Sequence, residues 1–342
     1  MRQRTHFATA MLFLGLAGLA SACSSPAPAP APKEQPAAPK PITADERVKW
    51  YQGCWDAFNQ KKMAELKQCY AGNATALDGA GKTVTGPDAI IASAEDFVKT
   101  FPDVRGDGQL ILSNGTHIAG VYLLTGTNSG TSKTPDGKEA PPTNKKIGLL
   151  FGHEIDSHPS TLKVTREFGV NDNATLANQI GVSKSPGRPL MAKGEASPKI
   201  VIAKSDATET KNLDVEKAQL DAWNKHDLNA VYAAVADDFV AHDMTETKDR
   251  NKMQNSDTDK AFWKAFSDAH LTPSSMWAAG DYVVSVGTFD GTNDGDMPPM
   301  IKKTGKKVTV PYLSIDRLED GKIKEGWLFY DGAAFGAQLG MK

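Results

Sequence analysis

The chain has 342 residues, which is long enough for two hydrophobic cores of ordinary size. Its formal net charge is −2 with both signs interspersed, so the sequence offers no electrostatic basis for binding nucleic acid. Hydrophobic residues make up 40% of the chain and often alternate with polar ones, a pattern typical of soluble, packed domains.

Residues 1–22 have the pattern of a secretory signal peptide. Arg2 and Arg4 precede an apolar run over residues 7–20, which is too short to cross a bilayer comfortably. The small residues before Cys23 resemble the cleavage box of bacterial lipoproteins, although Ala20 stands where those proteins prefer leucine. The resemblance implies a lipid on Cys23 and attachment to the bacterial cell envelope, facing the periplasm or in the outer membrane. Ordinary cleavage that leaves Cys23 free is the alternative.

Residues 23–42 form a Pro/Ala-rich segment. Alternating Pro and Ala favours extended polyproline II structure and cannot bury a core. We interpret this segment as a semi-rigid tether that lifts the following domains off a membrane.

The remainder of the chain is an internal repeat. Phe58-Asn59 corresponds to Trp223-Asn224, and the same offset carries Gly115 to Gly280. The register slips only at turn-rich places, and Asp172 and Asp331 still correspond near the two ends. The pattern predicts a tandem duplication with a first domain over 43–181, a linker over 182–210 and a second domain over 211–342.

In both copies the sequence pattern predicts helices first and strands afterwards. Thr43 and Glu46 form a capping box before the first helix of copy one. A short second helix is expected over 63–70 and 228–235, and a third over 87–101. Alternating strands are then expected over residues 109–113, 118–127, 146–155 and 162–170, with counterparts over 276–279, 282–292, 307–316 and 322–330. This order predicts an α+β fold with helices on one face of an antiparallel sheet, and KIVIA in the linker predicts one more short strand.

The second copy resembles the SnoaL-like polyketide cyclase branch of the nuclear transport factor 2-like superfamily over residues 213–340. The resemblance rests on LDAWNKHDLNAVYAAVADDFVAHD, on SIDRLEDGKIKEGW and on the final QLG; the first copy matches more loosely. It implies two tandem cones, each of three helices packed on a curved antiparallel sheet around a mostly apolar pocket. It also implies that the outer face of the sheet pairs with another copy.

The catalytic residue of the cyclases is missing from both copies. Their acid–base aspartate on the last strand falls at Leu328 in the second domain and at Gly169 in the first, and neither residue transfers protons. A polar pocket position of the family falls near Ser314. The resemblance therefore carries over the fold but not the reaction, so function has to be argued from the site.

Four other polar residues of the second copy could serve a pocket. His242 and Asp243 follow the predicted second helix, where this family often lines its pocket, and histidine is the natural proton carrier near neutral pH. Tyr312 and Tyr330 could supply hydroxyl groups from the wall of the cone. The alternative is that His242 satisfies a hydrogen bond while Asp243 starts a turn.

No metal or cofactor is expected. In HEIDSH, His153 and His158 straddle an expected hairpin and point to opposite sides, and no cysteine joins them. We interpret both as incidental histidines of a surface hairpin. Neither a phosphate-binding glycine loop nor a nucleophile elbow occurs in the sequence.

Three functions remain open. The first is binding of an apolar small molecule in the cone of domain 2. The second is an enzyme of the isomerase, cyclase or hydrolase type that uses His242 and Asp243. The third is an envelope scaffold whose cones are filled by side chains. We favour binding, and the contents of the second cone should discriminate among the three.

Two structural expectations follow from the residues. Cys54 and Cys69 lie on neighbouring edges of consecutive predicted helices, and in an exported, lipidated chain they are the only pair left, so we expect a disulfide. If Leu328 faces the pocket, then Trp327 and Phe329 face outward and need a cover. The tethered first copy can supply it, so the domains should pair as an internal pseudo-dimer in a monomeric chain.

Overall fold

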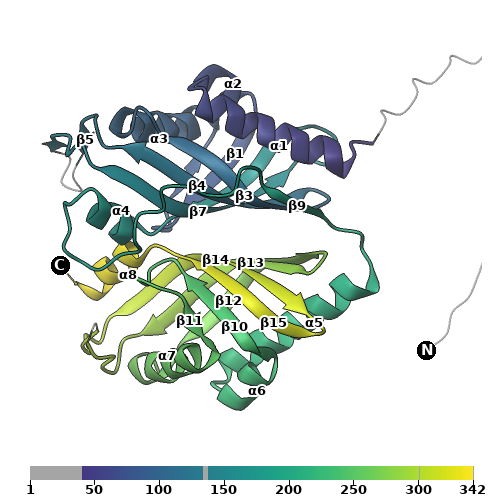
Figure 1. Ribbon diagram of the computed structural model, residues 1–342, viewed down its shortest axis with the longest axis vertical. Helices are drawn as coiled ribbons and strands as arrows, with labels where there is room; N and C mark the ends of the chain where they lie inside the picture. Colours follow the sequence, from purple (N-terminus) through teal and green to yellow (C-terminus); the bar gives the residue numbers. More distant parts are fainter. Residues whose placement is uncertain (1–40, 134–137, 300, 342) are drawn as a thin grey trace, which may run out of the picture. The chain divides into compact units, whose positions relative to one another are not determined.

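The computed structural model describes residues 41–133, 138–299 and 301–341, so the predicted signal peptide, Cys23 and nearly all of the tether lie outside the described residues. Residues 41–342 form one compact unit. It contains two α+β halves, each with its first three helices gathered on one face of a sheet (Figure 1). Among the described residues, no helix combines the length and the hydrophobicity needed to span a membrane.

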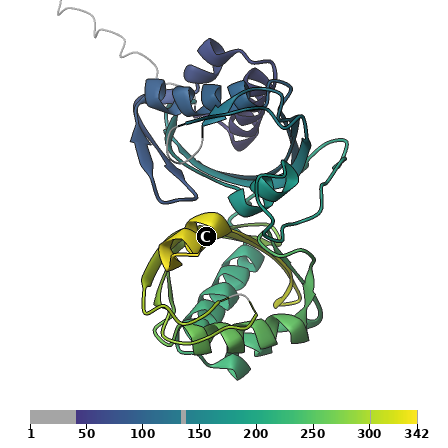
Figure 2. The same ribbon diagram turned by 90° about the vertical axis from the view of Figure 1, so that its left-hand side faces the viewer.

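The first half has a seven-stranded sheet with the strand order β2-β1-β8-β7-β4-β3-β9. The linker supplies its last strand, β9, where KIVIA predicted one. Figure 2 shows how this sheet curves around the helices. The elements are α1 (Ala44–Asn59), α2 (Met63–Lys67), β1 (Tyr70–Asp78), β2 (Thr83–Thr85), α3 (Pro87–Thr100), β3 (Arg105–Asn114), β4 (His117–Thr127), β5 (Ser132–Lys133), β6 (Glu139–Ala140), β7 (Lys146–Ser157), β8 (Val164–Val170), α4 (Asn173–Gln179) and β9 (Lys199–Ile202).

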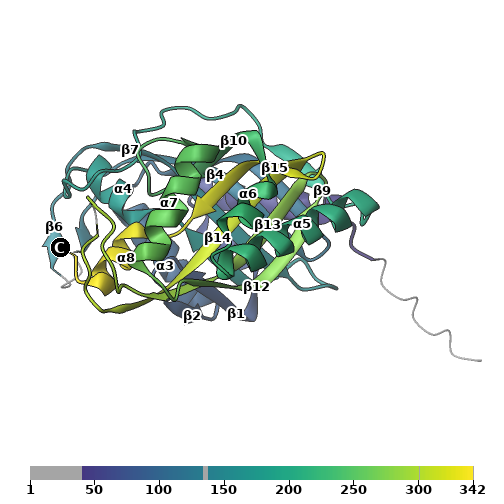
Figure 3. The same cartoon turned by 90° about the horizontal axis from the view of Figure 1, so that it is seen from below.

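The second half has a six-stranded sheet with the order β11-β10-β15-β14-β13-β12. Helices α5, α6 and α7 lie across its strands (Figure 3). The elements are α5 (Ala207–Asn224), α6 (Leu228–Ala233), β10 (Val235–Asp243), β11 (Arg250–Asn251), α7 (Lys252–Ala265), β12 (His270–Ala279), β13 (Tyr282–Thr292), β14 (Lys307–Glu319), β15 (Lys322–Phe329) and α8 (Gly332–Leu339). The two halves are therefore tandem cones, as predicted.

The sheets are mixed rather than purely antiparallel. The predicted second helices end at Lys67 and Ala233, and strands β1 and β10 begin three and two residues later. Each of these strands pairs in parallel with the last strand of its own cone, β8 or β15. Apolar spacing alone suggested a longer helix, but Phe239 and Ala241 bury alternate side chains of a strand in the cone.

Local sequence signals set the helix starts. The capping box of Thr43 and Glu46 is present at α1. Helix α5 starts at Ala207, inside the predicted linker, because Asp206 and Glu209 form a second capping box there. Helix α3 begins at Pro87, whose missing N–H is tolerated in a first turn.

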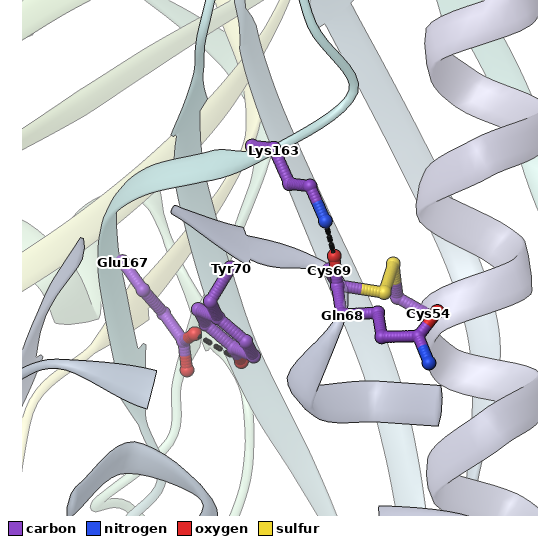
Figure 4. The surroundings of a disulfide bond; sticks show 6 residues. All are labelled: Cys54, Gln68, Cys69, Tyr70, Lys163 and Glu167. Atoms are coloured by element: carbon purple, nitrogen blue, oxygen red, sulfur yellow. Dashed lines mark hydrogen bonds between the residues drawn. A yellow bond between two sulfur atoms is a disulfide. The ribbon is translucent and has the colours of Figure 1, made fainter. Parts of the chain in front are cut away.

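The predicted disulfide joins Cys54 and Cys69, whose Cα atoms are 6.2 Å apart. It fastens α1 to the segment between α2 and β1 (Figure 4). Both cysteines are buried in a small apolar cluster with Leu66 and Ile91. The second half has Gln219 and Ala234 at the corresponding positions, so this disulfide has no counterpart there.

The outer faces of the two sheets share one apolar core. Phe168 of the first half and Phe329 of the second are both fully buried in it, and Trp327 packs against it. This confirms that Trp327 and Phe329 point away from the second cone and are covered by the first half. The other buried members are Leu110, Leu112, Ala119, Val121 and Val170 from the first half and Met244, Trp277, Ala279, Tyr282, Val284, Val286, Leu313 and Ile315 from the second.

Helices α4 and α8 cap each other across this core. Asp172 is the N-cap of α4, and its carboxylate also accepts a hydrogen bond from the backbone N–H of Gly332 in α8 at 3.1 Å. Asp331 is the N-cap of α8, and it accepts hydrogen bonds from the backbone N–H and the side-chain amide of Asn173 in α4. Each aspartate therefore satisfies N–H groups of both helices.

Candidate functional site

The interior of the second cone carries a row of polar side chains across the sheet. Asp243, Leu328, Ser314 and Ser285 are partners on successive strands β10, β15, β14 and β13, so their side chains share the inward face. The Ser285 hydroxyl is 3.2 Å from the hydroxyl of Tyr312. The predicted pocket positions Ser314, Leu328 and Tyr312 are thus brought together.

A pair of carboxyl groups lies beside this row, with Glu216 buried and Asp316 half-buried. Glu216 projects from α5 toward Asp316 on β14, and the Ser314 hydroxyl lies near the same carboxyl group. Among the described residues, Glu216 Oε2 has no hydrogen-bond partner. A Cβ atom at Gly326 would come within 2.5 Å of Asp316 Oδ1, so the bare backbone of Gly326 makes room for this carboxyl group. Neither acidic residue was singled out in the sequence.

The surroundings keep this pair partly protonated. Burial raises the pKa of Glu216, and the neighbouring charge of Asp316 raises it further. Burial also raises the pKa of Asp316, to about 7, although hydrogen bonds from Ser314 and Glu216 oppose this shift. Both shifts favour the protonated forms, so the pair is suited to hold a proton between its two carboxyl groups.

Apolar side chains flank the carboxyl pair along the strands. Val283 lies beside Asp316 in a cluster that includes Phe239, and a second cluster further along contains Phe289 and Phe266. Between them, Ser314, Asp316 and Leu328 are only partly buried.

A groove opens on the surface of the second half. It has a volume of about 620 Å³ and runs between α5 and the edge strand β12, with Leu220 and Met276 among its lining residues. Met276 is the strand partner of Ser285. The residues of the polar row themselves do not line this groove.

His242 and Asp243 lie on opposite faces of β10. On the outer face, the two ring nitrogens of His242 are each 3.0 Å from a carboxylate oxygen, Nδ1 from Asp249 and Nε2 from Glu325, and the ring stacks on Trp327. Burial alone would lower the pKa of His242, but these carboxylates outweigh it and raise the pKa. The structure therefore does not bring the two predicted catalytic side chains together.

Asp243 instead belongs to a hydrogen-bonded network inside the cone. Its carboxylate accepts hydrogen bonds from Arg250 and from the hydroxyl of Thr245, which is 2.9 Å from the hydroxyl of Tyr330. Arg250 also donates to Asn255 on α7. The network continues through Tyr232 and Asp259 to the indole N–H of Trp223. It joins α5, α6 and α7 to the sheet and so fixes that end of the cone.

The first cone has a different interior. His153 lies within β7 and is only 7% exposed, so the interpretation as an incidental surface histidine was wrong; the strand runs on to Ser157. Its Nδ1 is 2.7 Å from the Tyr51 hydroxyl, and its Nε2 is 3.4 Å from Glu167, which also accepts a hydrogen bond from Tyr70 (Figure 4).

Aromatic rings fill the rest of this first interior. Trp55 stacks on Tyr122 with ring centroids 3.8 Å apart, and Phe151 occupies the space that a side chain at Gly169 would need. The repeat offset maps His153 onto Ser314 and Tyr51 onto Glu216. This correspondence, which can be read from the sequence, could have identified these positions as interior positions of the two cones.

The two halves match related family models. Residues 213–339 match the SnoaL-like polyketide cyclase model, and residues 51–148 match the SnoaL-like domain model. Both halves of the chain are SnoaL-like domains. The SnoaL-like domain over the second half is matched almost from end to end, whereas the match to the first stops within β7.

Solved structures resemble single domains of this tandem SnoaL-like chain. AclR, a candidate hydroxylase from Streptomyces galilaeus, is 23% identical, with 39% of this chain and 97% of AclR covered and a TM-score of 0.36. A candidate SnoaL-like polyketide cyclase from Jannaschia sp. CCS1 is 18% identical, with 40% and 96% covered and a TM-score of 0.37. IdmH, a candidate polyketide cyclase from Streptomyces antibioticus, is 23% identical, with 38% and 99% covered and a TM-score of 0.34. No curated protein matches the chain.

Proposed function

We propose that the second SnoaL-like domain binds a small, mostly apolar molecule inside its cone and recognises a carbonyl or hydroxyl group on it through Glu216 and Asp316. The observation that carries this proposal is the carboxyl pair itself, which lies between two apolar clusters. Apolar walls would supply affinity, and a few fixed polar groups would supply orientation.

The energetics favour a functional role for this pair. Taking carboxyl groups out of water is expensive, and well-packed apolar residues at the same places usually give a more stable core. The first cone holds Tyr51 at the position of Glu216, in a filled aromatic interior. Perturbed acidic groups that keep accessible surface are typical of binding and catalytic sites.

Native mass spectrometry on gently purified protein tests the proposal. We expect the wild type to retain an additional small mass, or to take one up from a panel of apolar ketones, quinones and fatty acids. Asp316→Asn should lower the occupancy about tenfold, because it removes a charged hydrogen-bond partner. Glu167→Gln, a matched change in the first cone, should leave it unchanged. Absence of binding in the wild type, or equal occupancy in both variants, would contradict the proposal.

A second candidate function is acid–base catalysis, and the shared proton of the carboxyl pair favours it. An ionised and a protonated carboxyl side by side provide a base and an acid for moving a proton next to a carbonyl group. Exchange of such a proton for deuterium in a bound ketone, followed by NMR, measures this directly. If Asp316 acts, Asp316→Asn should slow exchange by roughly 10²–10⁴-fold. If His242 is the catalytic residue instead, as the sequence suggested, His242→Gln should slow the exchange.

We also propose that the chain is exported and held in the bacterial cell envelope by a lipid on Cys23. The Cys54–Cys69 disulfide supports export, because disulfides persist mainly in oxidising compartments. Cys23→Ser should move the protein from the membrane fraction of its native host to the soluble fraction. Membrane association that survives Cys23→Ser would show that another feature anchors it.

A further inference from the structure

We propose that the outer sheet face of the first domain holds a divalent transition-metal ion between His117, Glu154 and Asp156, a site separate from the interior of the second cone. One possible ligand atom from each residue lies within 4.8 Å of the others. His117 begins β4, and the two acidic residues lie two apart on β7, so all three side chains reach the same face.

An unsatisfied buried oxygen points to a ligand at this place. Glu154 is 0% exposed, and among the described residues its Oε1 has no hydrogen-bond partner. The Nδ1 of His117 is 3.8 Å from this oxygen but only 2.6 Å from Asp156 Oδ1. A proton on Nδ1 is therefore donated to Asp156, and Glu154 Oε1 receives no hydrogen bond from it. A cation between the three atoms would satisfy all of them.

Arg166 on β8 orients both carboxylates for such a role. It donates one hydrogen bond to Asp156 Oδ2 and another to Glu154 Oε2, each at 2.7 Å. The two oxygens that remain, Oδ1 and Oε1, are the ones closest to His117. Hydrogen-bonded carboxylates of this kind are the usual support around a metal site.

The donor set selects the class of metal. One imidazole nitrogen with two carboxylate oxygens suits Zn²⁺, Fe²⁺ or Mn²⁺ better than an all-oxygen ion such as Ca²⁺. With His117 neutral, two carboxylates and one guanidinium leave a net negative charge that a divalent ion can offset. The side chains of His117 and Asp156 are 37% and 26% exposed, so an ion can enter from solvent.

The site would lie at the contact between the domains. The ring of Trp277 from the second domain stacks on that of His117 at 6.0 Å. A bound metal would hold the imidazole in place and so support this contact. The second domain has Tyr282, Ile315 and Arg317 at the corresponding positions, so the site is not duplicated there.

Calorimetric titration of the full mature chain with ZnCl₂, after removal of metal with a chelator, tests the inference. We expect one Zn²⁺ per chain and a higher melting temperature. Glu154→Gln and His117→Gln should each weaken binding at least about tenfold. Glu325→Gln is the matched control, because it removes a carboxylate beside a histidine and an arginine in the second domain, and it should bind like the wild type.

Visible absorption of the Co²⁺-loaded protein gives a second readout that depends on the ligands and not on stability. The spectrum should change in His117→Gln, whose side chain is partly exposed and whose fold is easily checked by circular dichroism. The absence of stoichiometric Zn²⁺ uptake by the wild type would overturn the inference. Equal uptake by the wild type and both ligand variants would overturn it as well.

Discussion

Phe329→Ala is expected to lower the free energy of unfolding by about 3–5 kcal/mol, the usual cost of truncating a fully buried phenylalanine. Phe329 is 0% exposed in the core that the two sheets share. Its ring lies directly over Gly152 of the first half, where an added Cβ would come within 2.8 Å of it. The truncation therefore opens a cavity between the halves. Urea denaturation followed by circular dichroism gives the measurement.

Two comparisons make this result specific for the contact between the halves. Phe289→Ala empties a similar volume inside the second cone. It should lower stability but keep a single unfolding transition, whereas Phe329→Ala should broaden or split the transition because it uncouples the halves. Met253→Ala, at a side chain that is 70% exposed, should change little. If Phe329→Ala behaved like Met253→Ala, the shared core would not be what holds the halves together.

The carboxyl pair of the second cone should make the protein less stable as the pH rises. Burial raises the pKa of Asp316 from its ordinary 3.8 to about 7. The folded state therefore binds more protons than the unfolded state between these values, and the free energy of unfolding falls with increasing pH. The contribution of the pair is on the order of a few kcal/mol over this range. Glu216, whose pKa is also raised, acts in the same direction.

The variant Glu216→Gln tests how much the carboxyl pair contributes to this loss of stability with rising pH. The introduced amide can donate a hydrogen bond to an ionised Asp316, so the fall in the free energy of unfolding between pH 5 and pH 8 should be markedly smaller. The pKa values of His117 and His242 are also raised, which likewise reduces stability as pH rises, so only the difference from the wild type is diagnostic. Asp214→Asn, at an exposed residue of the same helix, is the control. Parallel pH profiles for the wild type and Glu216→Gln would mean that the pair does not hold its proton.

The sequence was sufficient for the fold wherever a local signal or the repeat carried the information. The capping box of Thr43 and Glu46 placed the first helix, alternation placed the long strands, and the position of Leu328 correctly turned Trp327 outward. Strands β1 and β10 were missed because their pairing with the last strand of each cone is a tertiary property.

The site was harder to predict because it depends on which side chains converge. Glu216 and Asp316 are 100 residues apart in sequence, and each alone is an ordinary acidic residue of a helix or a strand. His242 and Asp243 are neighbours in sequence, but neighbours on a strand face opposite sides. Assigning this segment to a strand would have placed His242 and Asp243 on opposite faces. The repeat offset would have matched His153 with Ser314 as equivalent positions of the two cone interiors.

The reciprocal caps between α4 and α8 make the order of synthesis matter. The first domain is complete when β9 ends at Ile202, but its outer face stays uncovered until β15 and α8 have been made. At typical rates of synthesis this takes on the order of 10–30 s. During that time Phe168 and Val170 present an apolar surface to other chains. Nascent chains should therefore be most prone to aggregation, and most dependent on chaperones, while the second domain is being made.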